Sequence, residues 1–136
     1  MLQLSKNWLE VAPWQVVTSL NQSLCQAREL ASQPNEKGFE PARQLWEESG
    51  HRPLTLFEAL DLCRRCHDLM PFTFNNGNTF AGIGRTLLDD WLQTLPSVEA
   101  QIVRNTVGHY IVSLIDKREL HRVFRHFETT WRIDAK

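Results

Sequence analysis

The sequence predicts an all-α fold, a compact single-domain bundle of five to six helices spanning residues 1–136. Apolar residues recur at spacings of three and four along most of the chain, which is the period of amphipathic helices. No segment shows a strand-like alternation of comparable strength. The chain has 136 residues, of which 42% are hydrophobic and 23% charged. This is the size and composition of one ordinary folded domain.

Prolines and polar capping residues set the expected helix ends. Pro13 suits a first helical turn, and Pro96 ends a long apolar stripe. Thr55 and Glu58 have the spacing of a capping box, in which the two side chains satisfy each other's free backbone amides. The expected helices cover residues 13–33, 41–49, 56–70, 80–95, 98–115 and 117–131.

Residues 72–80 read as a tiny hairpin or a tight turn. Asn76-Gly77 favours a type I′ hairpin turn, but an isolated two-stranded hairpin is marginal in water. The alternative is a turn whose Asn78 or Thr79 caps the next helix. Gly82 and Gly84 fall within the next expected helix, and a glycine there costs about 1 kcal/mol of helix stability relative to alanine. Close helix packing or a ligand beside the backbone should compensate for this loss. The candidate loop or ligand-facing residues are Asn75, Asn76, Gly77, Asn78, Gly82 and Gly84.

Cys63, Cys66 and His67 form the pattern C-x-x-C-H. On a helix these residues project from one side and could supply three ligands to zinc. The same pattern is found at c-type haem attachment sites, but an export signal is missing, which argues against haem. The favoured interpretation is that both cysteines lie on the buried side of their helix as small hydrophobic residues. Zinc is therefore kept as an alternative cofactor.

Basic residues gather in the last quarter of the chain. The whole chain has a formal net charge of −1, whereas residues 104–136 carry seven basic and four acidic side chains. A ridge of basic side chains along the last helix could bind nucleic acid through phosphates, or an acidic protein. Its candidate members are Arg104, Arg118, Arg122 and Arg125.

Two family patterns are incomplete in this chain. The glycines of residues 77–84 resemble a P-loop, but Ile83-Gly84 stands where a lysine and a hydroxyl residue are needed. Pro71-Phe72 with residues 76–78 resembles the loop of Fic-type AMP-transferring enzymes, but the acidic residue is absent and Thr79-Phe80 replaces Gly-Arg. We therefore assign the chain to neither family and predict no catalytic residue.

These observations favour a non-enzymatic helical protein-binding module, acting as an adaptor, accessory or assembly subunit. Its partner would be another protein or a second copy of the chain, with Trp8 and Trp131 as interface residues. A nucleic-acid-binding accessory subunit and a zinc-binding protein are the alternatives. No apolar run approaches the ~20 residues of a membrane span. Together with an odd number of cysteines, three, this predicts a cytoplasmic protein without a membrane partner.

Overall fold

The computed structural model describes the backbone of residues 5–134 and the side chains of residues 5–128. Within this range the chain forms seven α-helices and one 3₁₀ helix, and no strand. Their bounds are η1 Trp8–Val11, α1 Trp14–Ala27, α2 Phe39–Gly50, α3 Leu56–Asp68, α4 Asn76–Leu87, α5 Asp89–Thr94, α6 Ser97–Ile111 and α7 Lys117–Asp134. The all-α prediction is confirmed, and the hairpin at residues 72–80 does not form.

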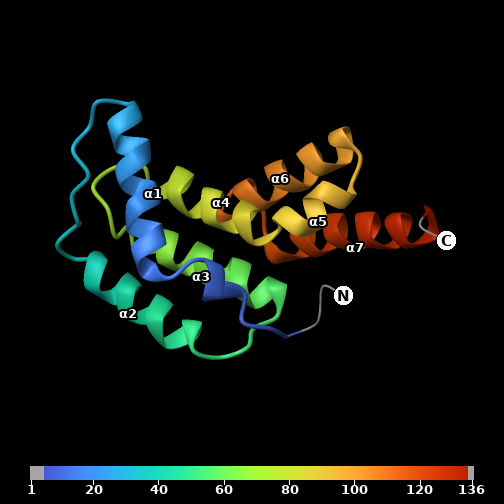
Figure 1. Cartoon of the computed structure of the whole chain (residues 1–136), viewed down its shortest axis with the longest axis horizontal. Helices are drawn as coiled ribbons and strands as arrows, with labels where there is room; N and C mark the ends of the chain where they lie inside the picture. Colours follow the sequence, from blue (N-terminus) through green and yellow to red (C-terminus); the bar gives the residue numbers. More distant parts are fainter. Residues whose placement is uncertain (1–4, 135–136) are drawn as a thin grey trace.

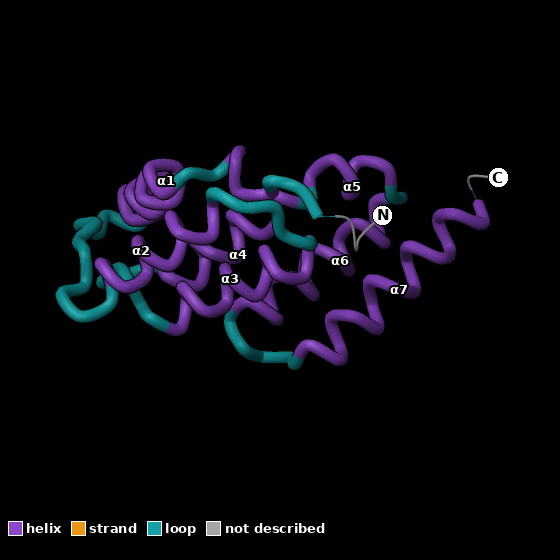
Figure 2. The backbone as a smooth tube through the Cα atoms, turned by 90° about the horizontal axis from the view of Figure 1, so that it is seen from below, coloured by secondary structure: helices purple, strands orange, loops and turns teal. Residues whose placement is uncertain are grey.

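Three helices occupy the centre of the bundle. α4 packs against α6, α3 and α1, and α3 also contacts α6 and α2. α7 packs against α6, and its C-terminal end extends away from the other helices (Figures 1 and 2). None of the helices in residues 5–134 is both long and apolar enough to cross a membrane.

The buried side chains form one hydrophobic cluster that joins all of these helices. At one end, aromatic rings from distant segments meet: Trp14 of α1 is stacked on Phe72 at 6.0 Å and meets Phe39 edge-on at 5.6 Å. Trp46 of α2 donates its indole N–H to the carbonyl of Ala12 at 2.8 Å. This bond holds α2 against the segment that links η1 to α1.

The predicted helix of residues 80–95 is wrong in two respects. It begins earlier, at Asn76, after Asn75 with a φ of 64°. It is also divided at Leu88, whose N–H bonds to the carbonyl of Arg85 only three residues back. This tighter turn lets side chains on both sides of it be buried, and it accounts for seven helices where five to six were expected.

The first long helix also ends earlier than predicted, at Ala27 rather than near Gln33. Glu29 takes a left-handed φ of 57°. The N–H of Leu30 then bonds to the carbonyl of Cys25 at 2.8 Å, which is the 6→1 bond of a Schellman motif. Glycine usually occupies the left-handed position, so the sequence held no signal for this end.

The capping box before α3 is confirmed. Thr55 Oγ1 accepts the N–H of Glu58 at 3.1 Å, and the Glu58 carboxylate accepts the N–H of Thr55 at 2.8 Å. At α7 only one of the two bonds forms, from the N–H of Glu119 to Asp116 Oδ1 at 2.9 Å. α3 and α7 therefore both begin where the sequence places them.

Candidate binding groove

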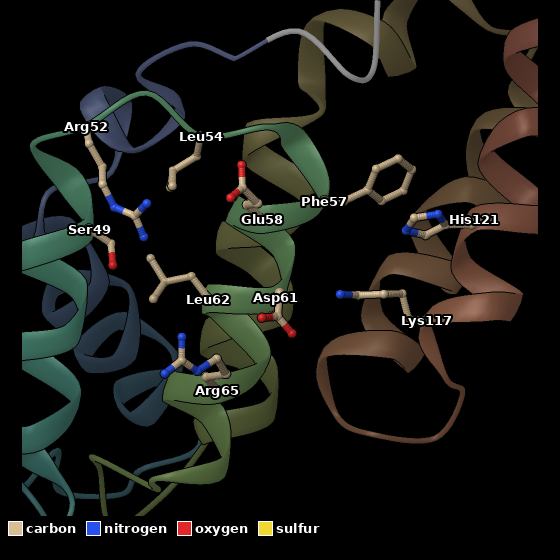
Figure 3. A pocket seen from close by; sticks show the side chains of 10 residues that line it. All are labelled: Ser49, Arg52, Leu54, Phe57, Glu58, Asp61, Leu62, Arg65, Lys117 and His121. Atoms are coloured by element: carbon tan, nitrogen blue, oxygen red, sulfur yellow. The ribbon is translucent and has the colours of Figure 1, made fainter.

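A groove of about 180 Å³ crosses the solvent side of α3, between the end of α2 and the start of α7 (Figure 3). We call it the α3 groove. The residues that line it are Ser49, Arg52, Leu54, Phe57, Glu58, Asp61, Leu62, Arg65, Lys117 and His121. They come from α2, the α2–α3 loop, α3 and α7.

The α2–α3 loop is held by backbone bonds to the start of the chain. Leu54 exchanges two N–H···O bonds with Lys6, each of 2.9 Å. Leu54 is 2% exposed, and Leu62 of α3 is 4% exposed. These two leucines make the apolar floor of the groove, and the fixed loop places the Arg52 side chain beside it (Figure 3).

α7 forms the opposite wall through an aromatic contact. The imidazole of His121 is stacked on the ring of Phe57, with 3.9 Å between ring centres. Phe124, one turn further along α7, is fully buried against Phe57 and Trp91, with ring centres 5.5 Å and 5.2 Å apart. These contacts fix the register of α7, so that Lys117 points toward Asp61 of α3 (Figure 3).

The cations of the groove form no close ion pair within the described part of the chain. Arg52, Arg65 and Lys117 are exposed, and no ion pair between described residues involves them. The two carboxylates of the groove are already bonded within the chain. Glu58 belongs to the capping box, and Asp61 accepts the Tyr110 hydroxyl at 3.2 Å. The cations of the groove are therefore available to a ligand, whereas its carboxylates already accept hydrogen bonds from the chain.

Hydrogen bonding and burial shift three pKa values around the groove. The bonds from Thr55 lower the pKa of Glu58, with Arg52 and Lys117 adding to the effect. Burial, followed by the charges of Arg125 and Lys117, lowers the pKa of His121. Its Nε2 is buried without a hydrogen-bond partner. Burial and then Asp61 raise the pKa of Tyr110 to about 12.

The predicted basic ridge lies outside the groove. Arg122 is bonded to Glu119, whereas Arg118 and Arg125 are exposed on α7. The Arg104 carbonyl accepts a bond from Arg85 at 3.4 Å on α6. None of these four arginines lines the groove.

The sequence analysis missed the three cations that do line the groove. Arg52, Arg65 and Lys117 lie in separate segments of the chain, and Arg65 is one of the two residues between the cysteines of C-x-x-C-H. No local pattern could have grouped them. Only α7 carried a usable signal, because Lys117 and Arg125 lie on one helix face with His121 at spacings of four.

The C-x-x-C-H residues do not come together as a ligand set. Cys63 and Cys66 are fully buried, and the Cys66 thiol donates to the Ala42 carbonyl at 3.7 Å. Burial raises the pKa of Cys63 and that of Cys66, the latter to about 12. His67 lies apart from them, with Nδ1 3.4 Å from Asp68 Oδ1. No group of three His, Cys, Asp or Glu among the described side chains is arranged to hold a metal ion.

Hydrogen bonds within the chain hold the start of α4 and the residue before it. Asn76 is 7% exposed, and its amide accepts the N–H of Phe72 at 2.9 Å and donates to the Phe72 carbonyl at 2.7 Å. Asn75 donates to the Cys25 sulfur at 3.5 Å. Asn76, Gly77 and Asn78 form the first turn of α4 rather than the predicted loop; Asn78 is exposed, and Gly77 lies beside Val112 and His67.

Helix packing accounts for Gly82 and Gly84 of α4. A Cβ on Gly84 would lie 2.5 Å from Ile111 Cδ1 of α6. A Cβ on Gly82 would lie 3.1 Å from Leu20 Cδ2 of α1. Neither glycine leaves its backbone open to a ligand from these sides.

Trp8, one of the two predicted interface tryptophans, does not line the groove. Trp8 is half-buried in η1, with the Lys6 ammonium 3.9 Å from the centre of its ring. Trp131 lies in α7, but its side chain is outside the described residues.

No family model matches this chain, and neither the curated proteins nor the solved structures give a significant match.

Proposed function

We propose that this chain is a non-enzymatic protein-binding module that holds an acidic segment of another protein in the α3 groove. The observation that carries the proposal is the set of three cations without ion pairs, Arg52, Arg65 and Lys117, around one groove. Carboxylates of a partner would form charge-assisted hydrogen bonds with them. No ion pair between described residues would have to break.

The size of the groove favours a few side chains of a protein partner over a whole small molecule. At about 180 Å³ it is smaller than the ~300–1,000 Å³ typical of small-molecule sites. Its two carboxylates are engaged in a helix cap and with Tyr110, as described above. A groove of this kind is suited to a few side chains of a partner that remains largely on the surface.

The apolar parts of the groove specify the segment further. Leu54 and Leu62 form its floor, and the stacked rings of Phe57 and His121 form one wall. An extended peptide places alternate side chains on opposite sides. A segment in which acidic residues alternate with apolar ones would therefore carry its acidic side chains along one side and its apolar side chains along the other.

Nucleic acid fits the groove less well than an acidic protein does. Glu58 and Asp61 lie among the cations and would repel neighbouring phosphates. The strongest part of the predicted ridge is also neutralised, because Arg122 is bonded to Glu119. An acidic peptide can place its charges at separate points, whereas a phosphate backbone carries a charge at every nucleotide.

The test is the binding of a labelled peptide followed by fluorescence anisotropy. The probe is a ten-residue peptide that alternates glutamate and leucine, and its counterpart alternates lysine and leucine. We expect only the glutamate peptide to bind, with an affinity that falls as the salt concentration rises. Arg65→Glu should weaken binding about tenfold, the equivalent of about 1.4 kcal/mol.

Arg118→Glu is the matched control, because it changes the net charge equally at an exposed α7 residue outside the groove. It should leave the affinity unchanged. Equal losses for the two variants would show non-specific attraction and refute the assignment of the groove. Tighter binding of a ten-nucleotide single-stranded DNA, lost equally in both variants, would favour the nucleic-acid alternative. Sedimentation of the protein alone would show whether a second copy is the partner.

A further inference from the structure

A larger cavity, of about 460 Å³, lies on the other side of the last turn of α2. It opens to solvent and is bordered by η1, the first turn of α1 and the C-terminal part of α2. Ser49 and Arg52 line the α3 groove, whereas Gly50 and His51 line this cavity. The two sites share no lining residue, so the inference below is independent of the proposed function.

Part of the cavity wall is apolar, aromatic and rigidly held, and Gln15 and His51 add polar side chains to it. Leu9, Trp14 and Trp46 line it and are 4%, 7% and 1% exposed. Trp46 is anchored by its hydrogen bond to Ala12, and Trp14 is packed between Phe39 and Phe72. Because each ring is fixed by contacts that do not involve the cavity, the space exists without a ligand and little ordering is needed for binding.

Gly50 keeps one side of the cavity open. A Cβ built on this residue would meet only Leu9 Cβ, at the ordinary contact distance of 3.9 Å. A side chain at position 50 would therefore enter the free space beside Leu9 without striking the backbone. The cavity volume depends directly on the absence of this side chain.

The rim carries negative charge. Glu10 and Glu47 line the cavity and are both exposed. Glu47 is bonded to Arg43 at 2.8 Å, whereas Glu10 forms no ion pair with any described residue. Arg43 does not line the cavity, and no lysine or arginine does. An apolar, tryptophan-lined space with a free carboxylate at its mouth is complementary to a cation that carries an apolar body.

We propose that this cavity binds a small hydrophobic amine. Its aromatic or aliphatic body lies against Leu9, Trp14 and Trp46, and its ammonium group meets Glu10 at the rim. A ligand with about ten non-hydrogen atoms is expected to bind in the millimolar range. The carboxylate selects the amine over a neutral or anionic molecule of the same shape.

The test compares three probes of similar size, namely 2-phenylethylamine, 2-phenylethanol and 3-phenylpropanoate. Binding is followed by NMR through the indole N–H signals of the tryptophans in the ¹⁵N-labelled protein. We expect the amine to bind tightest and to shift the signals of Trp14 and Trp46. Equal binding of the anion, or shifts confined to other signals, would overturn the proposal.

Two variants and a control separate the cavity from its charge. Gly50→Leu should abolish binding of all three probes, because its side chain occupies the space. Gly50→Ala adds one methyl group and should weaken every probe in a protein that retains its fold. Glu10→Gln should weaken the amine alone, about fivefold, and Glu36→Gln, in the exposed loop before α2, should have no effect. Unchanged amine affinity in Gly50→Ala would show that the amine does not bind in this cavity. Unchanged amine affinity in Glu10→Gln would show that this carboxylate does not bind the ammonium group.

Discussion

The junction of α4 with α6 and the junction of α3 with α7 are built on opposite plans. Where α4 meets α6, Gly84 lies so close to Ile111 and Val107 that a Cβ would approach them to 2.5 Å and 3.1 Å. Where α3 meets α7, a ring stack forms the contact and charged side chains line the groove beside it. The first junction leaves no room for another molecule, whereas the second leaves cations without partners.

This difference changes where function is sought. The most conspicuous sequence features, C-x-x-C-H and Asn76-Gly77, lie in α3 and α4. The side chains of Cys63, Cys66 and Asn76 are buried and form contacts within the fold. The α3 groove is built from residues of separate segments that no single motif brings together. A short motif can therefore mark a structural constraint, while a binding surface can lack any signature in the sequence.

Phe124→Ala should have the largest effect and should break the α3–α7 junction. Phe124 is fully buried and contacts Phe57 and Trp91, so its loss removes the main anchor of α7 at this point. We expect the free energy of unfolding to fall by about 3–5 kcal/mol, measured by urea denaturation. Arg125→Ala, at the adjacent exposed position, should change it by less than about 0.5 kcal/mol. A loss below about 1 kcal/mol for Phe124→Ala would mean that this contact does not hold α7.

Gly84→Val tests the closed junction. Its side chain must displace Ile111 and Val107, and overpacking of this kind costs about 1–3 kcal/mol. Gly82→Ala, which meets only Leu20 Cδ2 at 3.1 Å, should cost less. Peptide affinity of the folded Gly84→Val protein should match that of the original chain, because the groove lies elsewhere. A marked loss of affinity without unfolding would show that the two junctions are coupled.

The smallest effect is expected from protonation of His121. Phe57 is stacked on this residue, Lys117 and Arg125 share its helix face, and Glu58 and Asp61 line the same groove. Its folded-state pKa is lowered, so the unfolded chain takes up the proton more readily. Stability is therefore complete above an unfolded pKa of about 6.5 and declines as pH falls through that value toward the folded pKa.

Urea denaturation between pH 7.5 and pH 5 measures this loss, and His121→Gln should reduce the slope. Because burial is the largest cause of the shift, the slope should persist at high salt, which screens Lys117 and Arg125. A slope that vanishes with salt would assign the effect to charge repulsion. An identical slope in the variant would assign it to other groups.

Local chemistry accounts for the parts of the fold that were predicted. The apolar periodicity identified every long helix, and the Thr55–Glu58 capping box placed the start of α3. The errors fall where a tertiary contact replaces a local signal. Leu88 divides the predicted helix of residues 80–95, and Glu29 ends α1 in a conformation that glycine usually adopts.

The candidate site was less predictable than the fold. The sequence analysis found an arginine ridge on the last helix, but the α7 residues that line the groove are Lys117 and His121. The difference is one helical position, which turns a side chain by ~100°. The packing of Phe124 against Phe57 and Trp91 places this part of α7 beside α3, and those residues are far apart in the chain.

The sequence by itself determined the all-α class, the apolar faces of the helices and the cap of α3. Each of these depends on residues within a few positions of one another, where spacing alone sets geometry. Only the tertiary structure decided that Arg52, Arg65 and Lys117 surround one groove, and that Gly50 leaves a cavity beside Trp14 and Trp46. These arrangements join separate segments, and their relative positions follow from how the helices pack rather than from any one stretch of residues.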